Sequence, residues 1–215
     1  MKTPFTVDEF LAVFRSYNES VFPVQVIFYL FGGFVIYLTT LNSEKTGRSI
    51  SGIIGLLWLW MGIVYHFLFF SAINPGAYIF GAMFILQGAL FLTFGVIRTG
   101  LSFRFTTDSG GIAGMTMMLF ALIGYPVLGY FNGHIYPASP TFGLPCPTTI
   151  FTFGLLMLAD RRIPVVLLLI PFIWSIIGIS ATLNLGIKED AVLTVSGVVS
   201  TAFVLFRNKS LSSSM

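Results

Sequence analysis

Residues 49–71 read SISGIIGLLWLWMGIVYHFLFFS and contain no lysine, arginine, aspartate or glutamate. A helix needs about 20 apolar residues to cross the roughly 30 Å hydrocarbon core of a bilayer. This stretch is long enough to do so. It therefore predicts a transmembrane helix, and the rest of the chain can be interpreted around it.

The composition of the whole chain supports a membrane protein. Of its 215 residues, 56% are hydrophobic and only 9% are charged, and the mean hydropathy is +0.92. Soluble domains are about 25% charged because their surface must be hydrated. The composition excludes an ordinary soluble enzyme and a disordered chain, and the single cysteine excludes an intrachain disulfide.

Six further stretches resemble the first in composition. Together they predict an all-α integral membrane bundle of seven transmembrane helices, surrounded by the lipid bilayer. The predicted spans are residues 22–41, 49–71, 76–97, 110–131, 146–159, 163–184 and 191–206. No lysine, arginine, aspartate or glutamate lies inside any of them, which disfavours an ion-coupled carrier.

The segments that flank the spans have different characters. Residues 1–21 contain Thr6-Val7-Asp8-Glu9, a capping-box pattern that predicts the start of a helix. Apolar residues then recur at helical spacing, so residues 1–21 should form a short amphipathic helix. Such a helix can lie in the headgroup plane, cap the bundle, or do both. Residues 207–215 are predicted to be a cytoplasmic tail.

The basic residues indicate an orientation. Eight of the eleven lie in alternate connections, at 42–48, 98–109, 160–162 and after 206. Lysine and arginine concentrate on the cytoplasmic side of membrane proteins. We therefore expect a multi-pass protein of the cell membrane with its N-terminus outside and its C-terminus in the cytoplasm. The same rule explains the net charge of +3 without a nucleic-acid partner, because no basic cluster is interleaved with aromatic residues.

The connection 132–149 is the candidate site of function. It contains Pro137, Pro140, Pro145 and Pro147, which stiffen the backbone and exclude a regular helix or central strand. We expect this rigid, uncharged loop to fold over the outer mouth of the bundle. Polar residues should gather beneath it and form an outer vestibule that binds a ligand. These residues are His66, Asn74, His134, Tyr136, Thr141, Cys146 and Thr148.

Three functions are compatible with this vestibule. The first is binding or permeation of a small neutral or soft solute, including a copper or zinc ion held by His66, His134 and Cys146. The second is a membrane enzyme with Cys146 as nucleophile and a histidine as base; the sequence disfavours it because no catalytic motif is present. The third is a scaffold or assembly subunit without a site of its own. The sequence leaves open whether the chain forms a homo-oligomer.

Several short motifs resemble those of one known family. They are His66-Phe67, Ile73-Asn74-Pro75, Gln87, Tyr136-Pro137 and the string PTFGLPCPTTIF at 140–151. The chain resembles a prokaryotic family of small polytopic membrane proteins catalogued as domain of unknown function 6064. The resemblance extends from the amphipathic N-terminus to the seventh span. It implies an integral membrane protein and transfers no catalytic residue.

Overall fold

The computed structural model describes residues 4–41, 43 and 45–213. Residues 1–3 of the predicted amphipathic segment, 42 and 44 of the first basic connection, and 214–215 of the predicted tail lie outside the described residues. The described chain is all-helical and contains no strand, which confirms the predicted fold class.

The described part of the chain contains nine α-helices and four short irregular helices. The α-helices are α1 (Val7–Val21), α2 (Val24–Thr40), α3 (Thr46–Trp60), α4 (Ala77–Phe91), α5 (Ser109–Leu119), α6 (Tyr125–Phe131), α7 (Pro145–Met157), α8 (Val166–Leu185) and α9 (Asp190–Ser213). Three π-helical segments continue α3, α4 and α5, namely η1 (Met61–Phe69), η3 (Leu92–Ile97) and η4 (Phe120–Gly124). A 3₁₀ turn, η2 (Phe70–Ala72), follows η1.

Five helical segments within the described residues are long and apolar enough to cross a membrane. They are Thr46–Ala72, Ala77–Ile97, Ser109–Phe131, Val166–Leu185 and Asp190–Leu211. The pair α1 and α2 would make a sixth, but it is bent by 89°, and α7 is a shorter apolar helix. The predicted number of seven spans and the predicted orientation therefore stay predictions.

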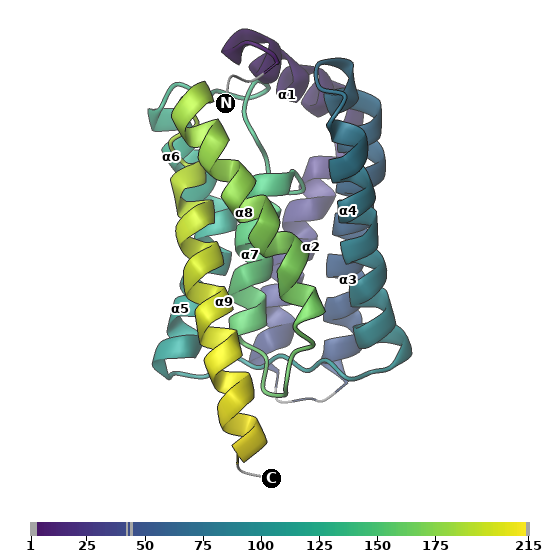
Figure 1. Ribbon diagram of the computed structural model, residues 1–215, viewed down its shortest axis with the longest axis vertical. Helices are drawn as coiled ribbons and strands as arrows, with labels where there is room; N and C mark the ends of the chain where they lie inside the picture. The colour runs from purple at the N-terminus through teal and green to yellow at the C-terminus, as the bar shows by residue number, and fades with distance from the viewer. Residues whose placement is uncertain (1–3, 42, 44, 214–215) are drawn as a thin grey trace.

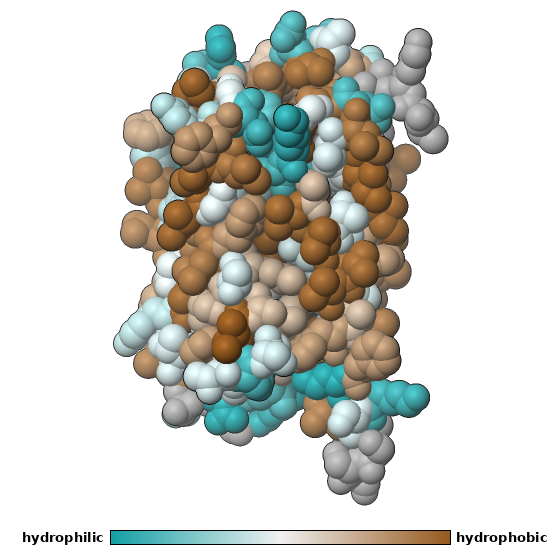
Figure 2. All heavy atoms as spheres, turned by 90° about the vertical axis from the view of Figure 1, so that its left-hand side faces the viewer, coloured by the Kyte–Doolittle hydropathy of each residue, from teal (hydrophilic) through white to brown (hydrophobic). Residues whose placement is uncertain are grey.

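The helices run alternately between the two ends of an elongated bundle (Figure 1). At one end, α1 lies across the bundle; the C-terminus lies at the other. The connections 98–108 and 158–165, which carry basic residues, lie at the C-terminal end. Along the sides, apolar residues such as Leu30 and Ile79 are more than 60% exposed. Figure 2 shows this apolar band between two more hydrophilic ends, as lipid-facing helices require.

Glycines bring α3 and its continuation η1 close to α4. A Cβ atom built on Gly62 would lie 2.7 Å from the Gly81 carbonyl oxygen, and one on Gly88 would lie 2.7 Å from the Gly55 carbonyl oxygen. Small residues permit this approach in lipid, where no hydrophobic force drives helices together. Gly55 and Gly62, both within residues 49–71, thus face a neighbouring helix.

The N-terminal helix has the predicted capping box. The Glu9 backbone N–H donates to the Thr6 hydroxyl, and the Thr6 N–H donates to the Glu9 carboxylate at 2.7 Å. The buried face of α1 contains Phe10, Phe14 and Tyr17. The Trp60 indole N–H donates to the Tyr17 hydroxyl at 2.9 Å, which ties α1 to α3. In the structure this helix caps the bundle, and its position in the headgroup plane stays a prediction.

The helix α7 lies in the middle of the bundle. All of its residues are buried except Cys146, which is half-buried. The proline-rich segment before it descends from the α1 end into the bundle (Figure 1), where Phe142 and Leu144 are almost fully buried. Irregular backbone is tolerated at such depth only when protein surrounds it. The loop therefore folds into the mouth of the bundle rather than only over it.

The last helix is longer than its predicted span of 191–206. It begins at Asp190 and continues through Ser213, so part of the predicted tail is helical. Asp190 is consequently the first residue of a candidate span, although the predicted spans contain no acid. Near the other end of α9, the Arg207 guanidinium donates to the Met157 and Leu156 carbonyls at the end of α7.

Candidate functional site

A cavity of about 490 Å³ lies beneath α1, bounded also by η1, α4, α7, α8 and α9. Its walls are mainly aromatic. The aromatic lining residues are Phe5, Phe10, Phe14, Tyr65, Phe70, Phe80 and Trp174. Ligand sites in proteins are concave and mostly apolar, with few polar groups and volumes of about 300–1,000 Å³. By size and lining, this cavity belongs to that class.

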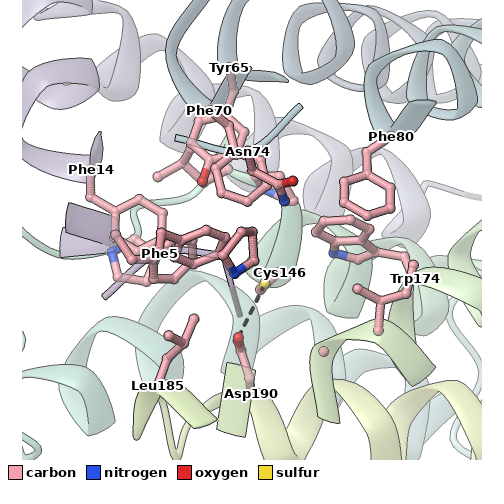
Figure 3. A pocket seen from close by; sticks show the side chains of 17 residues that line it. Phe5, Phe14, Tyr65, Phe70, Asn74, Phe80, Cys146, Trp174, Leu185 and Asp190 are labelled. Carbon is pink, nitrogen blue, oxygen red and sulfur yellow. Dashed lines mark hydrogen bonds between the residues drawn. The ribbon is translucent and has the colours of Figure 1, made fainter. Parts of the chain in front are cut away.

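The polar groups of the cavity gather at one place. The Cys146 thiol donates to Asp190 Oδ2 at 3.4 Å, and the Tyr125 hydroxyl donates to Asp190 Oδ1 at 2.5 Å. Asp190 is only 1% exposed. Figure 3 shows the Cys146–Asp190 pair between the aromatic side chains, with the Asn74 amide and the Trp174 indole nitrogen turned toward it. The carboxyl of Asp190 is the only ionisable carboxyl among the described lining residues.

The chain order explains this arrangement. Cys146 lies in the first turn of α7 and Asp190 is the first residue of α9, so the N-termini of two helices meet at the pair. A helix N-terminus carries a partial positive charge, which favours a carboxylate. Two helix termini thus help to hold one buried acidic group.

A second buried acid lies beside the first. Glu189 Oε1 lies 2.6 Å from His134 Nδ1, and Asn132 Nδ2 donates to Glu189 Oε2 at 3.1 Å. Glu189 is fully buried. Because His134 and Asn132 follow α6, these contacts fasten the end of α6 to the start of α9. His134 is therefore occupied by a carboxylate partner.

The predicted vestibule residues divide between two cavities. Asn74 and Cys146 line the cavity beneath α1, whereas His134, Tyr136 and Thr141 line a second cavity of about 350 Å³ between α2 and α6. The second cavity is more polar and also contains Gln25 and Tyr29. The structure thus brings together two of the seven residues in one place and three in another.

The remaining two predicted site residues line neither cavity. Thr148 is buried, and its hydroxyl accepts the Gly143 backbone N–H at 3.0 Å. His66 is also buried, and neither ring nitrogen has a hydrogen-bond partner in the described structure. Aromatic rings surround it, with the Phe84 centroid at 4.6 Å and the Trp174 centroid at 5.4 Å. His66 is part of an aromatic cluster that includes Phe80 and Trp174 of the cavity lining.

The predicted metal ligands have different partners. Cys146 contacts Asp190, His134 contacts Glu189 and His66 contacts aromatic rings. Within the described ranges, no group of three or more histidine, cysteine, aspartate or glutamate residues is placed to hold a metal ion. The nucleophile–base hypothesis requires a hydrogen bond between Cys146 and a histidine. Within the same ranges, no hydrogen bond joins Cys146 to His66 or His134. The geometry thus gives no support to copper or zinc binding or to a cysteine–histidine enzyme.

The residues predicted for the site did not include Asp190 or the aromatic residues that line the cavity beneath α1. Asp190 stands in a short charged connection, Lys188-Glu189-Asp190, and such charges usually face water. The only sign of a buried acid was that Glu189 and Asp190 directly precede an apolar helix. The same pattern is equally typical of an exposed first helical turn. The aromatic residues of α1 appeared as one apolar face, and the pattern alone does not show that this face covers a cavity.

One family model matches the chain over residues 7–214, and its description is a family of unknown function, DUF6064. The match includes every residue of both cavities except Pro4 and Phe5. No curated protein and no solved structure matches the chain.

Proposed function

The chain belongs to this family of unknown function, and we propose that it is a membrane protein that binds a small, mainly apolar solute in the cavity beneath α1. The observation that carries the proposal is the cavity itself. It combines an aromatic lining with one buried carboxyl and one half-buried thiol.

The size of the cavity supports a small organic molecule rather than a bare ion. At about 490 Å³ it exceeds what one or two water molecules fill. Apolar walls of this extent are poor ligands for a metal ion and good contacts for hydrocarbon or aromatic groups. The solute would bury its apolar part against phenylalanine rings and place one polar group at Cys146 and Asp190.

The position of α1 supports a covered site. Phe10 and Phe14 of α1 line the cavity, and α1 lies across the end of the bundle (Figure 1). Asn18 and Tyr17 attach this helix to the proline-rich loop and to α3. A bound solute would therefore be enclosed by α1 on one side and by the bundle on the other.

The single cysteine offers a direct test, because it lines the cavity. We would measure the rate at which N-ethylmaleimide alkylates Cys146 in the purified protein, with and without small aromatic solutes that are neutral, cationic or anionic. At least one of these solutes should slow the reaction in a saturable manner.

Two tryptophan substitutions on α8 supply the matched comparison. Leu185→Trp adds bulk to a buried lining residue, whereas Leu183→Trp places the same side chain at a position that is 77% exposed. Protection of Cys146 should persist in Leu183→Trp and be lost in Leu185→Trp. The proposal is overturned if Cys146 reacts only after denaturation, or if no solute of any charge protects it in the unmodified protein.

A further inference from the structure

We infer that the solute of this cavity is an organic cation, an ammonium group on an aromatic or apolar body, with Asp190 as its counter-charge. This inference rests on the proposed function and adds the chemical class of the solute. It is carried by the charge of the lining, the partners of Asp190 and the aromatic walls.

The described residues of the lining include one acid and no base. Among the described residues that border the cavity, Asp190 is the only acidic residue, and none is a lysine, arginine or histidine. A site lined this way favours a positively charged guest over a negatively charged one, because binding sites are electrostatically complementary to their ligands. The low dielectric of an aromatic cavity strengthens this preference.

Among the described residues, the hydrogen-bond partners of Asp190 are neutral. Tyr125 and Cys146 each donate one hydrogen bond to it, and neither carries a positive charge. His134 pairs with the neighbouring Glu189 instead. A buried carboxylate without a cationic partner is unfavourable, even when helix termini assist it. An ammonium group in the cavity would supply the missing partner.

The aromatic lining of the cavity also favours an organic cation. Ring faces carry negative electrostatic potential and attract ammonium groups, most strongly where water is excluded. Tyr65, Phe70 and Phe80 border the cavity, and Figure 3 shows them around the Cys146–Asp190 pair. Aromatic rings around a single carboxyl can therefore hold both parts of an amphiphilic cation.

One unused donor points into the cavity as well. Trp174 is 7% exposed, and its indole nitrogen has no hydrogen-bond partner in the described part of the chain. In Figure 3 this nitrogen is turned toward Cys146. A buried donor left unpaired is costly, so a bound molecule with an acceptor atom beside its ammonium group would satisfy it.

Three solutes that share a phenyl ring test the inference: 2-phenylethylammonium, 2-phenylethanol and phenylacetate. Each would be titrated at neutral pH against alkylation of Cys146, in full-length protein held in an uncharged detergent. The ammonium should protect at a concentration at least about tenfold lower than the alcohol, and phenylacetate should protect least.

Asp190→Asn removes the charge and keeps an acceptor for Tyr125. In this variant the ammonium and the alcohol should protect at similar concentrations. Leu183→Trp, which leaves the cavity lining unchanged, should retain the preference and controls for partitioning into detergent. If Asp190→Asn does not fold, the three-solute comparison in the unmodified protein still decides.

The outcomes separate the two proposals. Equal or tighter binding of 2-phenylethanol overturns the cation inference and leaves the cavity-binding proposal standing. Tightest binding of phenylacetate does the same. Protection by none of the three overturns both. A preference for the ammonium that survives Asp190→Asn overturns the assignment of Asp190 as the counter-charge.

Discussion

The Thr141 hydroxyl of the proline-rich loop donates a 3.0 Å hydrogen bond to the side-chain oxygen of Asn18 on α1. The same amide donates to the Pro137 and Ser139 carbonyls at 2.7 and 2.8 Å. Asn18 is fully buried, so one side chain fastens the covering helix to the loop that enters the bundle. Prolines cannot donate backbone hydrogen bonds, and an external side chain supplies donors that the loop needs.

We expect Asn18→Ala to lower the free energy of unfolding by about 2 kcal/mol, because it leaves two half-buried carbonyls and the buried Thr141 hydroxyl without this partner. The measurement is thermal unfolding in detergent. Ser20→Ala, at an exposed position on the same helix, should leave the unfolding temperature nearly unchanged. Equal unfolding temperatures for the two variants would show that Asn18 does not hold the loop.

The sequence predicted what depends on local pattern. Hydrophobic stretches located the helices, and the Thr6 to Glu9 spacing located the start of α1, because both signals involve residues close in the chain. The stiff loop was placed only in part: irregular backbone extends to Leu144, whereas Pro145 and Pro147 lie in the first turn of α7, where proline is compatible with a helix. These features follow from backbone chemistry and need no knowledge of distant partners.

The candidate site depends on contacts that no local pattern encodes. Asp190 meets Tyr125 and Cys146 across separations of 65 and 44 residues. His66 was a reasonable ligand from its position, yet its neighbours are rings from other helices. Whether a polar residue in an apolar helix faces a cavity, a partner or a ring depends on how helices rotate and pack. Composition does not fix that rotation.

Gly143 and Gly133 give a second prediction, which separates backbone strain from crowding. Both have positive φ, +98° and +89°, a conformation that disfavours other residues. A Cβ on Gly143 would lie 2.1 Å from the Phe28 ring, whereas nothing lies within 4 Å of one on Gly133. Gly133→Ala should cost about 1 kcal/mol and Gly143→Ala about 3 kcal/mol or more. Similar losses in unfolding free energy would contradict the close contact with Phe28.

The cap of α5 gives a pH-dependent prediction. Asp108 accepts the Gly111 N–H and the Thr106 hydroxyl, and these hydrogen bonds lower the pKa of its carboxyl below the ordinary value of 3.8. A carboxyl with a lowered pKa stabilises the fold above its unfolded-state pKa and loses this effect as the pH falls through the folded-state value. Asp108→Ala should therefore cost about 1 kcal/mol at neutral pH, typical of a lost N-cap.

Unfolding temperatures measured between about pH 7 and about pH 3 check this expectation. The difference between the unmodified protein and Asp108→Ala should narrow at the acid end. Asparagine can also cap the helix, but without a charge. The difference in unfolding temperature between Asp108→Asn and Asp108→Ala should therefore change little with pH. A gap between the unmodified protein and Asp108→Ala that stays constant would mean that ionisation of Asp108 contributes nothing to the cap.

Arg207 gives a prediction about the opposite end of the bundle. Its guanidinium donates to the Met157 and Leu156 carbonyls at 2.8 and 3.1 Å, at the end of α7 where helix carbonyls lack partners. Arg207→Met keeps a long apolar stem and removes both hydrogen-bond donors, so it should lower the free energy of unfolding by about 2–3 kcal/mol. Arg162→Met changes an exposed residue at the same end and should have little effect on thermal unfolding. If both variants lower the unfolding temperature equally, the loss of a positive charge, rather than of the two hydrogen bonds, would explain the effect of Arg207→Met.

The path of α7 gives the last prediction, because this helix has only 13 residues and separates the proline-rich loop from the Arg161-Arg162 turn. In a Cys146→Ala background, single cysteines at Ile135, which is 57% exposed, and at the exposed Arg161 report on its two sides. A membrane-impermeant maleimide should label Ile135→Cys in intact cells and Arg161→Cys only after permeabilisation, because basic turns face the cytoplasm. The reverse pattern would invert the orientation. Equal labelling of both positions in intact cells would mean that α7 does not cross the bilayer, and the number of spans would fall accordingly.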